Sequence, residues 1–309
     1  MLTKGQIIKA LRKSLNMSQE ELVGSSKDSD TVDDIVSVSN LSKIENGHQE
    51  PEWNTFKTLL EKMGQDPRRF MYAMSKNEAA AIELEYDILD LLEQRNYKKI
   101  EKQLDKFENL HGLSKEAQSF VDCVRVILDE QDGVPAEDLI ASLIDLYGED
   151  KLNKLLKTNI RNIFLTQHQI RILNFLANCY TQNNSDKAIA IWELVLNYIE
   201  LVVADKPGFT TSYAAICYTL SRHLGLQGEL EESLEVSTKG IDWCIKYDRH
   251  QFYAALILNK SYVLIELNKD LEEAHELILT SYLLFKQKGD LENAELIKEY
   301  AKNKKIRLL

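Results

Sequence analysis

The stretch Ser37-Val38-Ser39-Asn40-Leu41-Ser42-Lys43-Ile44-Glu45-Asn46-Gly47 decides how the N-terminal part of this chain is interpreted. A serine that can cap a helix begins the stretch, and a glycine that can end one closes it. Leu41 and Ile44 are three residues apart, so they share one face of the expected helix. The other faces of the helix carry five polar or small side chains, namely Val38, Ser39, Asn40, Ser42 and Lys43.

Short helical patterns flank this stretch on both sides. On the N-terminal side, Ile7, Ile8, Leu11 and Leu15 form one apolar stripe, and Ser18 and Glu21 form a capping box at the start of a second helix. On the C-terminal side, Pro51 suits the first turn of a fourth helix and Asp66-Pro67 starts a fifth. Five short helices predict a compact domain over residues 1–72. The short polar groups of 37–47 can approach base edges closely, so we expect this helix to be the recognition helix of a helix-turn-helix.

The whole composition predicts an all-α protein. The chain has 309 residues, of which 44% are hydrophobic and 28% charged, with only 12 Gly and 4 Pro. So few helix breakers favour helices throughout. The polar N-terminus has no signal-peptide pattern, and no apolar run is long enough to span a bilayer. The four cysteines are far apart in apolar helical patterns, which is typical of reduced core residues in a cytoplasmic protein.

No catalytic constellation is present in the sequence. The six histidines have no metal-ligand spacing and are expected on the surface or at helix ends. No phosphate-binding loop, dinucleotide fingerprint or nucleophile elbow occurs. We therefore expect no enzyme activity, no cofactor and no metal.

The charge distribution bears on nucleic-acid binding. The net charge is −11, yet residues 1–70 hold 10 Lys and Arg against 11 Asp and Glu. Four of those acidic residues lie in the segment 27–34, so the small domain without that segment is slightly basic. The acidic excess therefore belongs to the second domain. Because the basic footprint is weak, we expect a homodimer to provide enough phosphate contacts.

From residue 76 onward the helical patterns lengthen and begin to repeat. Three segments, 169–192, 213–234 and 253–274, each contain an apolar helix, a polar turn and a second helix with a small residue near its start. The small residues (Ala188, Ser233 and Ala274) allow the paired helices to approach closely. A repeat of this form predicts a helical-hairpin solenoid over residues 76–309 that resembles tetratricopeptide repeats.

The N-terminal motif Leu11-Arg12, Met17–Leu22, Leu41–Gly47 and Pro51 resembles the Xre/Cro-type helix-turn-helix domain of phage repressors. The resemblance implies an ion pair between Arg12 and Glu45 that ties the first helix to the recognition helix. It implies that double-stranded DNA is contacted by Gln19, Val38, Ser39, Asn40, Ser42, Lys43 and Asn46. One departure is the inserted segment Ser25–Val36, because that family joins the two helices by a few residues only.

The combination of such a domain with helical hairpins resembles the Rgg/PlcR/PrgX-type (RRNPP) regulators, which respond to short secreted signalling peptides in quorum sensing. The resemblance implies a transcription regulator that holds a short signalling peptide on the first helices of its repeats. Asparagine amides suit this role because they donate and accept at once, matching a peptide group. The candidate peptide-binding residues are Asn174, Asn178, Tyr213, Tyr218, Arg222, Asn259 and Tyr262.

Two alternatives remain at this stage. The solenoid could bind a protein partner with no peptide ligand, or the N-terminal domain could serve in an adaptor that no longer binds DNA.

Overall fold

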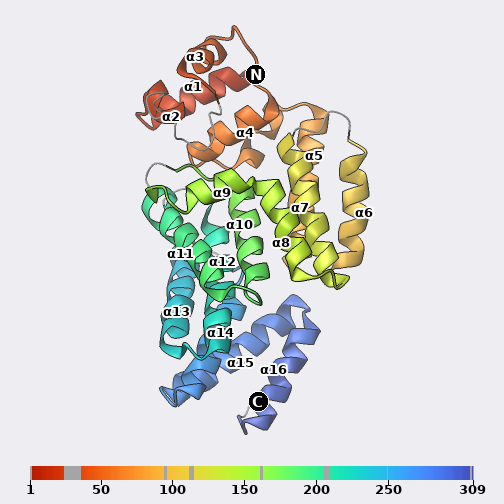
Figure 1. Cartoon of the computed structure of the whole chain (residues 1–309), viewed down its shortest axis with the longest axis vertical. Coiled ribbons are helices and arrows are strands. Elements are labelled where there is room, and N and C mark those ends of the chain that lie inside the picture. The colour runs from red at the N-terminus through yellow and green to blue at the C-terminus, as the bar shows by residue number, and fades with distance from the viewer. Residues whose placement is uncertain are drawn as a thin grey trace. The chain divides into compact units, whose positions relative to one another are not determined.

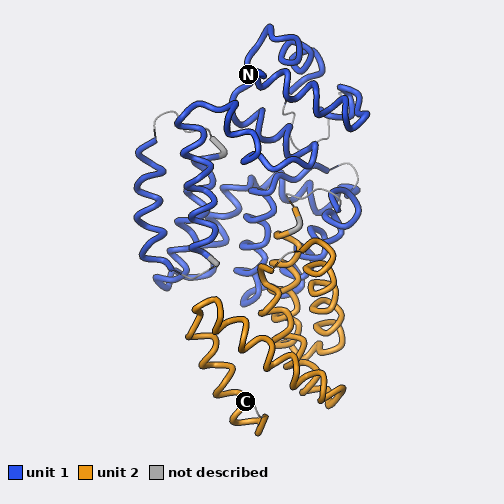
Figure 2. The backbone as a smooth tube through the Cα atoms, turned by 180° about the vertical axis from the view of Figure 1, so that it is seen from behind, with its two compact units in different colours: residues 1–208 blue, residues 209–309 orange. Residues whose placement is uncertain are grey.

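The computed structural model describes residues 2–23, 36–93, 96–110, 115–160, 163–204, 209–248, 250–306 and 308. Every regular element assigned within these residues is helical, which confirms the expected fold class (Figure 1). The chain forms two compact units, residues 1–208 and 209–309 (Figure 2). The inserted segment Ser25–Val36 lies outside the described residues, apart from Val36. The expected functional boundary between residues 72 and 76 stays a prediction.

Among its described residues, the first unit begins with five short helices around one core. They are α1 (Lys4–Ser14), α2 (Gln19–Val23), α3 (Val38–Glu45), α4 (Trp53–Lys62) and the 3₁₀ helix η1 (Pro67–Ala73). Their shared core contains the fully buried side chains Ile8, Leu22, Leu41, Phe56 and Leu59. Ile7 and Ile8 of the expected stripe are buried, and Leu11 packs against the core. Leu15 was also expected to point inward, but it is 44% exposed, because it lies just past the end of α1 as its C-cap residue. The fifth helix is a tighter 3₁₀ helix, and Asp66 caps it by accepting a hydrogen bond from the N–H of Arg68.

A glycine lets α1 and α3 approach each other closely. A Cβ atom added at Gly5 would lie 2.0 Å from the carbonyl oxygen of Ile44. No L side chain fits at such a distance without displacement of backbone. The sequence therefore brings the backbone of α1 directly against the C-terminal end of α3.

After η1, the described residues of the first unit form seven further helices and a short π-helical segment. They are α5 (Lys76–Glu93), α6 (Tyr97–Glu108), α7 (Lys115–Gln131), α8 (Ala136–Tyr147), α9 (Glu149–Leu155), α10 (Gln167–Tyr180), α11 (Ser185–Tyr198) and η3 (Ile199–Val203). Helices pack as neighbours in the pairs α5 with α6, α7 with α8 and α10 with α11. Thr166 begins α10 with a capping box to Gln169.

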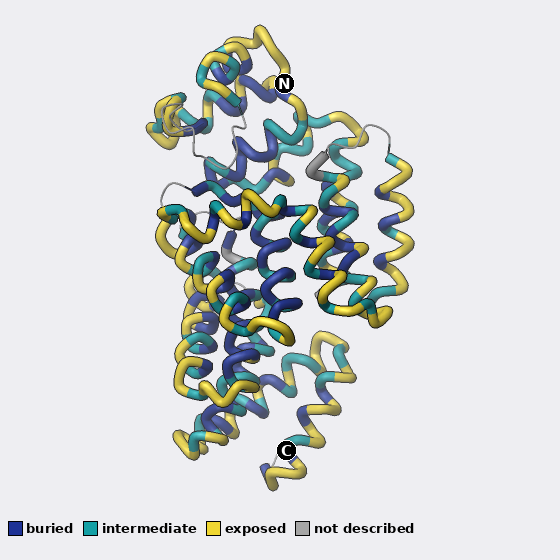
Figure 3. Tube along the Cα trace, in the orientation of Figure 1, coloured by how far each residue is buried: buried dark blue, intermediate teal, exposed yellow. Residues whose placement is uncertain are grey.

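The described residues of the second unit form five helices of 13 to 18 residues. They are α12 (Thr210–Gln227), α13 (Leu230–Lys246), α14 (Tyr253–Glu266), α15 (Leu271–Lys288) and α16 (Leu291–Asn303), and each packs on the next. Within both units, buried residues alternate with exposed ones along each helix, as amphipathic helices require (Figure 3).

The small residues of the repeats lie at the contacts between paired helices. Ala188, Ser233 and Ala274 are fully buried. The hydroxyl of Ser233 donates a hydrogen bond to the carbonyl oxygen of Ser221 on α12, at 2.6 Å. A larger side chain at this position would push the two helices apart, so the expected close approach is present.

Candidate functional site

Helix α3 has one buried and one exposed face. Its N-terminus is capped by Ser37, whose Oγ accepts a hydrogen bond from the N–H of Asn40 at 3.2 Å. Leu41 and Ile44 are buried in the core. Ser39 and Lys43 are exposed on the opposite side. The helix therefore offers polar groups to solvent while its apolar face fixes its position.

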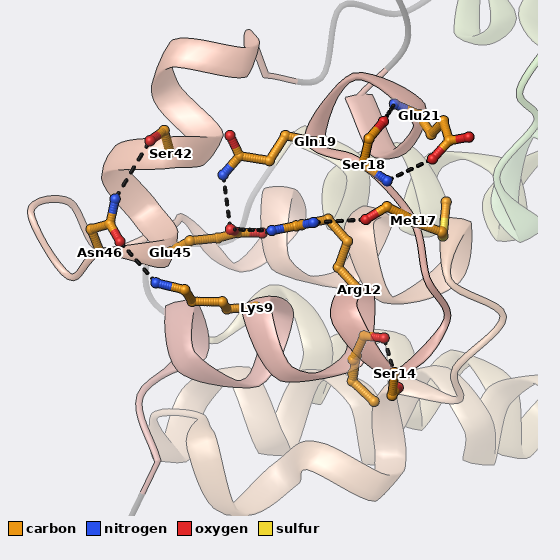
Figure 4. A network of polar contacts seen from close by, with 11 residues as sticks. Lys9, Arg12, Ser14, Met17, Ser18, Gln19, Glu21, Ser42, Glu45 and Asn46 are labelled. Carbon is orange, nitrogen blue, oxygen red and sulfur yellow. Dashed lines mark hydrogen bonds and ion pairs between the residues drawn. The ribbon is translucent and has the colours of Figure 1, made fainter.

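An ion pair holds the C-terminal end of α3 to α1 (Figure 4). The Nε of Arg12 donates to one carboxylate oxygen of Glu45 at 2.6 Å, and its Nη2 donates to the other at 2.8 Å. The Nη1 of Arg12 donates to the carbonyl oxygen of Met17 at 2.7 Å, in the turn before α2. One guanidinium thus connects α1, α3 and the start of α2, and the structure brings together the pair implied by the sequence resemblance.

Gln19 lies in the same network. Its Nε2 donates a hydrogen bond to Glu45 Oε2 at 2.8 Å (Figure 4). Burial alone would raise the pKa of Glu45, but the hydrogen bonds from Arg12 and Gln19 outweigh it and lower the pKa. The hydrogen bond to Glu45 raises the pKa of Arg12. Both groups of the pair are therefore charged, and the amide of Gln19 is oriented by a partner inside the domain.

The other residues expected at the DNA face differ in exposure. Asn46 is exposed, whereas Asn40 and Ser42 are half-buried. Val38 is also half-buried and packs against the hydrophobic core. The most accessible polar groups of the set are therefore Ser39, Lys43 and Asn46.

One cation near this face was missed from the sequence. The Nζ of Lys9 donates a hydrogen bond to Asn46 Oδ1 at 2.9 Å (Figure 4). Lys9 lies on α1, outside the motif that carries the resemblance. Lys9 precedes Arg12 by three residues, so both side chains lie on one side of α1. This spacing would have allowed Lys9 to be predicted near the helix that is expected to face DNA.

Two of the candidate ligand residues lie on α10 in the first unit. Asn174 Oδ1 accepts a hydrogen bond from the indole N–H of Trp192 at 2.8 Å. Asn178 lies one turn later on the same face and is half-buried. Within the described part of the chain, no hydrogen bond is assigned to the Asn178 side chain. Asn178 is therefore the more available of the two amides.

The three candidate tyrosines lie in the second unit and pack against other aromatic rings. Tyr213 is only 2% exposed and stacks on Trp243, with ring centroids 4.0 Å apart. Tyr218 packs on Phe252 at 5.9 Å. Tyr262 packs on Tyr300 at 4.3 Å. Each ring contributes to packing between helices of this unit.

The remaining polar candidates of the second unit are Arg222 and Asn259. Asn259 Nδ2 donates to the carbonyl oxygen of Tyr218 at 3.3 Å and to Ser221 Oγ at 3.1 Å, so it joins α14 to α12. Arg222 is exposed. The guanidinium of Arg222 is thus the most accessible donor among the candidates of this unit.

The described residues contain no cluster suited to metal chemistry, and their cysteines are not exposed. No group of three or more His, Cys, Asp or Glu side chains there could hold a metal ion. All four cysteines are free and buried. His223 is buried within α12, which contradicts the expectation of a surface or helix-end position, and burial lowers its pKa. None of the helices in the described ranges has the length and apolar character that crossing a membrane requires.

Comparison with known proteins gives one family match and several similar structures. The model of the RNPP family C-terminal domain matches residues 85–309. A search of the curated proteins gave no match.

PlcR from Bacillus thuringiensis, solved in complex with the peptide PapR7 and DNA, is 20% identical with a TM-score of 0.60, and the alignment covers 96% of this chain and 98% of that chain. ComR from S. thermophilus, solved with DNA and its signalling peptide ComS, is 16% identical with a TM-score of 0.55, over 96% and 98% of the two chains. PlcR in its apo form is 18% identical with a TM-score of 0.57, over the same shares. These structures share the fold of a helix-turn-helix domain followed by helical hairpins.

Proposed function

This chain belongs to the RNPP family, and we propose that it is a DNA-binding transcription regulator whose helical hairpins bind a short signalling peptide that alters operator binding. The observation that carries the proposal is the outward polar face of α3, with Ser39 and Lys43 exposed over a buried apolar face. A helix held in this way can enter the major groove, where short polar side chains meet base edges. The complexes of PlcR and ComR with DNA and peptides support the proposal by analogy.

We assign the DNA contacts to α3 and its neighbours. The contacting residues would be Gln19, Val38, Ser39, Asn40, Ser42, Lys43 and Asn46, with Lys9 added because it lies against Asn46. Phosphate contacts would come from the lysines, and base contacts from the amides and hydroxyls. In a symmetric homodimer, two copies of α3 would read half-sites about 34 Å apart or a multiple of that spacing.

Substitution at α3 tests DNA binding. The full chain would first be used to select a binding site from random duplex DNA. Asn40→Ala and Lys43→Ala would then be compared with the parent in a gel-shift titration, and each lost base contact should weaken binding by ~1–3 kcal/mol. Lys106→Ala is the matched control, because it removes an exposed lysine from α6, away from α3. Failure of the parent to select any site at moderate salt would refute DNA recognition.

The peptide would lie along the first helices of the hairpins. In the first unit, Asn174 and Asn178 on α10 are the proposed backbone contacts. In the second unit we keep Tyr213, Tyr218, Arg222, Asn259 and Tyr262 as candidates. Asn178 and Arg222 rank first, because the structure assigns no packing role to their side chains in the described ranges.

Calorimetry tests the ligand. Short peptides from small secreted reading frames of the same genome would be titrated into the full chain. A binding peptide should lose affinity on Asn178→Ala or Arg222→Ala and keep it on Asn303→Ala, an exposed asparagine at the end of α16. If no peptide binds and a protein co-purifies instead, the hairpins serve a protein partner.

A further inference from the structure

A buried ionic cluster joins three helices that are far apart in sequence. The Nζ of Lys57 on α4 lies 3.1 Å from Glu85 Oε2 on α5. The Nη1 of Arg171 on α10 lies 3.0 Å from Glu85 Oε1. The side chains of Lys57 and Glu85 are each 11% exposed, and that of Arg171 is 24% exposed. One carboxylate therefore links α4, which belongs to the N-terminal helices, to α10, which carries two of the candidate ligand residues.

The charges of this cluster are fixed over the ordinary pH range. Burial alone would raise the pKa of Glu85, but Lys57 and Arg171 outweigh it and lower the pKa to about 2. His168 lies beside the cluster, and burial, Arg171 and Lys57 together lower its pKa to about 3. The carboxylate is therefore charged and the imidazole neutral, and neither charge changes near neutral pH.

Two further contacts reinforce the same junction. Glu61 Oε2, one turn after Lys57 on α4, accepts a hydrogen bond from the backbone N–H of Gln167 at 3.2 Å. Gln167 is the first residue of α10. The Nζ of Lys4 on α1 lies 2.8 Å from Glu78 Oε1 on α5. The N-terminal helices are thus tied to α5 and α10 by side chains as well as by the chain itself.

We infer that Glu85 is a positioning residue that holds α4 on α10, so that the N-terminal helices and the helices α5–α11 move as one body. Loss of its charge would remove the anion that the cations of Lys57 and Arg171 share in a largely buried site, which favours separation of α4 from α10.

The cluster also has a place in ligand response, in so far as the function proposed above holds. Arg171 precedes Asn174 by three residues and Asn178 by seven, so all three lie on one face of α10. A peptide bound at the two asparagines would therefore act within two turns of the residue that connects α10 to α4. The rigid connection itself requires neither peptide nor DNA.

Pulsed electron paramagnetic resonance on the full chain, without DNA or peptide, tests the connection separately from the proposed function. Spin labels would be placed at Lys13→Cys on α1 and Glu193→Cys on α11, the helix that packs on α10. Both positions are exposed and lie in the same unit, while the four native cysteines are buried. We expect a single narrow distance distribution in the parent. Glu85→Gln should broaden it severalfold while helix content, followed by circular dichroism, stays unchanged.

The matched control is Glu108→Gln. It removes an exposed ion pair with Arg125, 2.6 Å in length, from the same unit and should leave the distribution narrow. Arg171→Gln is a second test variant, for use if Glu85→Gln does not fold. It keeps the contact between Lys57 and Glu85 but removes the contact between Glu85 and α10, so it should also broaden the distance distribution. An unshifted, narrow distribution in the folded cluster variants would overturn the inference.

Discussion

Replacing Arg12 by methionine should loosen the N-terminal helices far more than loss of an ordinary surface ion pair does. Arg12 makes two hydrogen bonds to Glu45, at 2.6 and 2.8 Å, and the Glu45 side chain is only 1% exposed. Methionine fills a similar space but leaves that carboxylate with Gln19 as its remaining donor in the network. Stranding one partner of a buried pair costs ~3–5 kcal/mol, which corresponds to a roughly 10²- to 10⁴-fold larger opening constant.

Hydrogen exchange followed by mass spectrometry measures this opening in the full chain. Amides of α1 and α3 should exchange faster in Arg12→Met by the factor given above, while amides of α12 to α16 keep the parent rates. Arg125→Met is the control, because its pair with Glu108 is exposed, at 50% and 35%, and should contribute only ~0–1 kcal/mol.

A double variant separates the free energy of the ion pair from that of side-chain packing. Arg12→Met combined with Glu45→Met removes both charges and should recover ~1–3 kcal/mol relative to the sum of the two single changes. If Arg12→Met accelerates exchange less than about fivefold, or if the two changes simply add, the reasoning about a stranded charge is wrong.

Three further predictions concern stability and reactivity. Gly5→Ala should destabilise the N-terminal helices by about 2–3 kcal/mol in hydrogen exchange, because the added Cβ would lie 2.0 Å from Ile44 O; parent-like exchange of α1 and α3 would contradict this. Burial is the largest of the causes that lower the pKa of His168 to about 3. As the pH falls below about 6.5, this imidazole is therefore protonated in the unfolded chain but not in the folded one. Stability should therefore fall between about pH 7 and pH 5.5, in urea unfolding, by about 1 kcal/mol more in the parent than in His168→Gln, and equal losses would refute the assignment. Burial raises the pKa of the Cys123 and Cys179 thiols to about 12, so both should resist alkylation at neutral pH until the chain unfolds; rapid labelling of either in native buffer would contradict their burial.

Local signals in the sequence were sufficient for the N-terminal helices. Ser37 as a cap and the pair Leu41 and Ile44 as the buried face were predicted, since capping and helical periodicity involve residues within one turn. The 3₁₀ geometry of η1 was not predicted. It has a kink at Phe70, with φ −115°, where the ring packs against the core, and no local pattern in the sequence marks this position.

The helices after residue 76 include two cases in which hydrophobic periodicity did not predict the structure. Helix α9 was missed because its 7 residues offer only Leu152 and Leu155 as buried positions. His223 was expected at a surface or helix end, yet it is 6% exposed inside α12, a helix that packs on both α13 and α14. A helix with apolar residues on several sides does not reveal from its own sequence which polar residue is enclosed.

The sequence predicted the kind of candidate site, but it did not predict all of the contacts between the site residues. Arg12 and Glu45 could be paired through a resemblance, although 33 residues separate them. The hydrogen bond from Gln19 to Glu45 could not be predicted, because it depends on how α2 lies against α3. The triad of Lys57, Glu85 and Arg171 was also missed, since no motif relates three positions that only the folded chain brings together.

The hydrogen bonds between paired helices and the triad of Lys57, Glu85 and Arg171 differ in whether gene duplication can copy them. Ser233 reaches Ser221 over 12 residues and Ser281 reaches Ala254 over 27, so each bond is contained in a short contiguous segment. Duplication of such a segment copies its closing bond intact, and an array of hairpins can lengthen or shorten without new compensating changes. Glu85 reaches Arg171 over 86 residues, so duplication of a single hairpin cannot copy that junction. Gain and loss of hairpins should therefore be tolerated after α11, while the order of α4, α5 and α10 stays fixed.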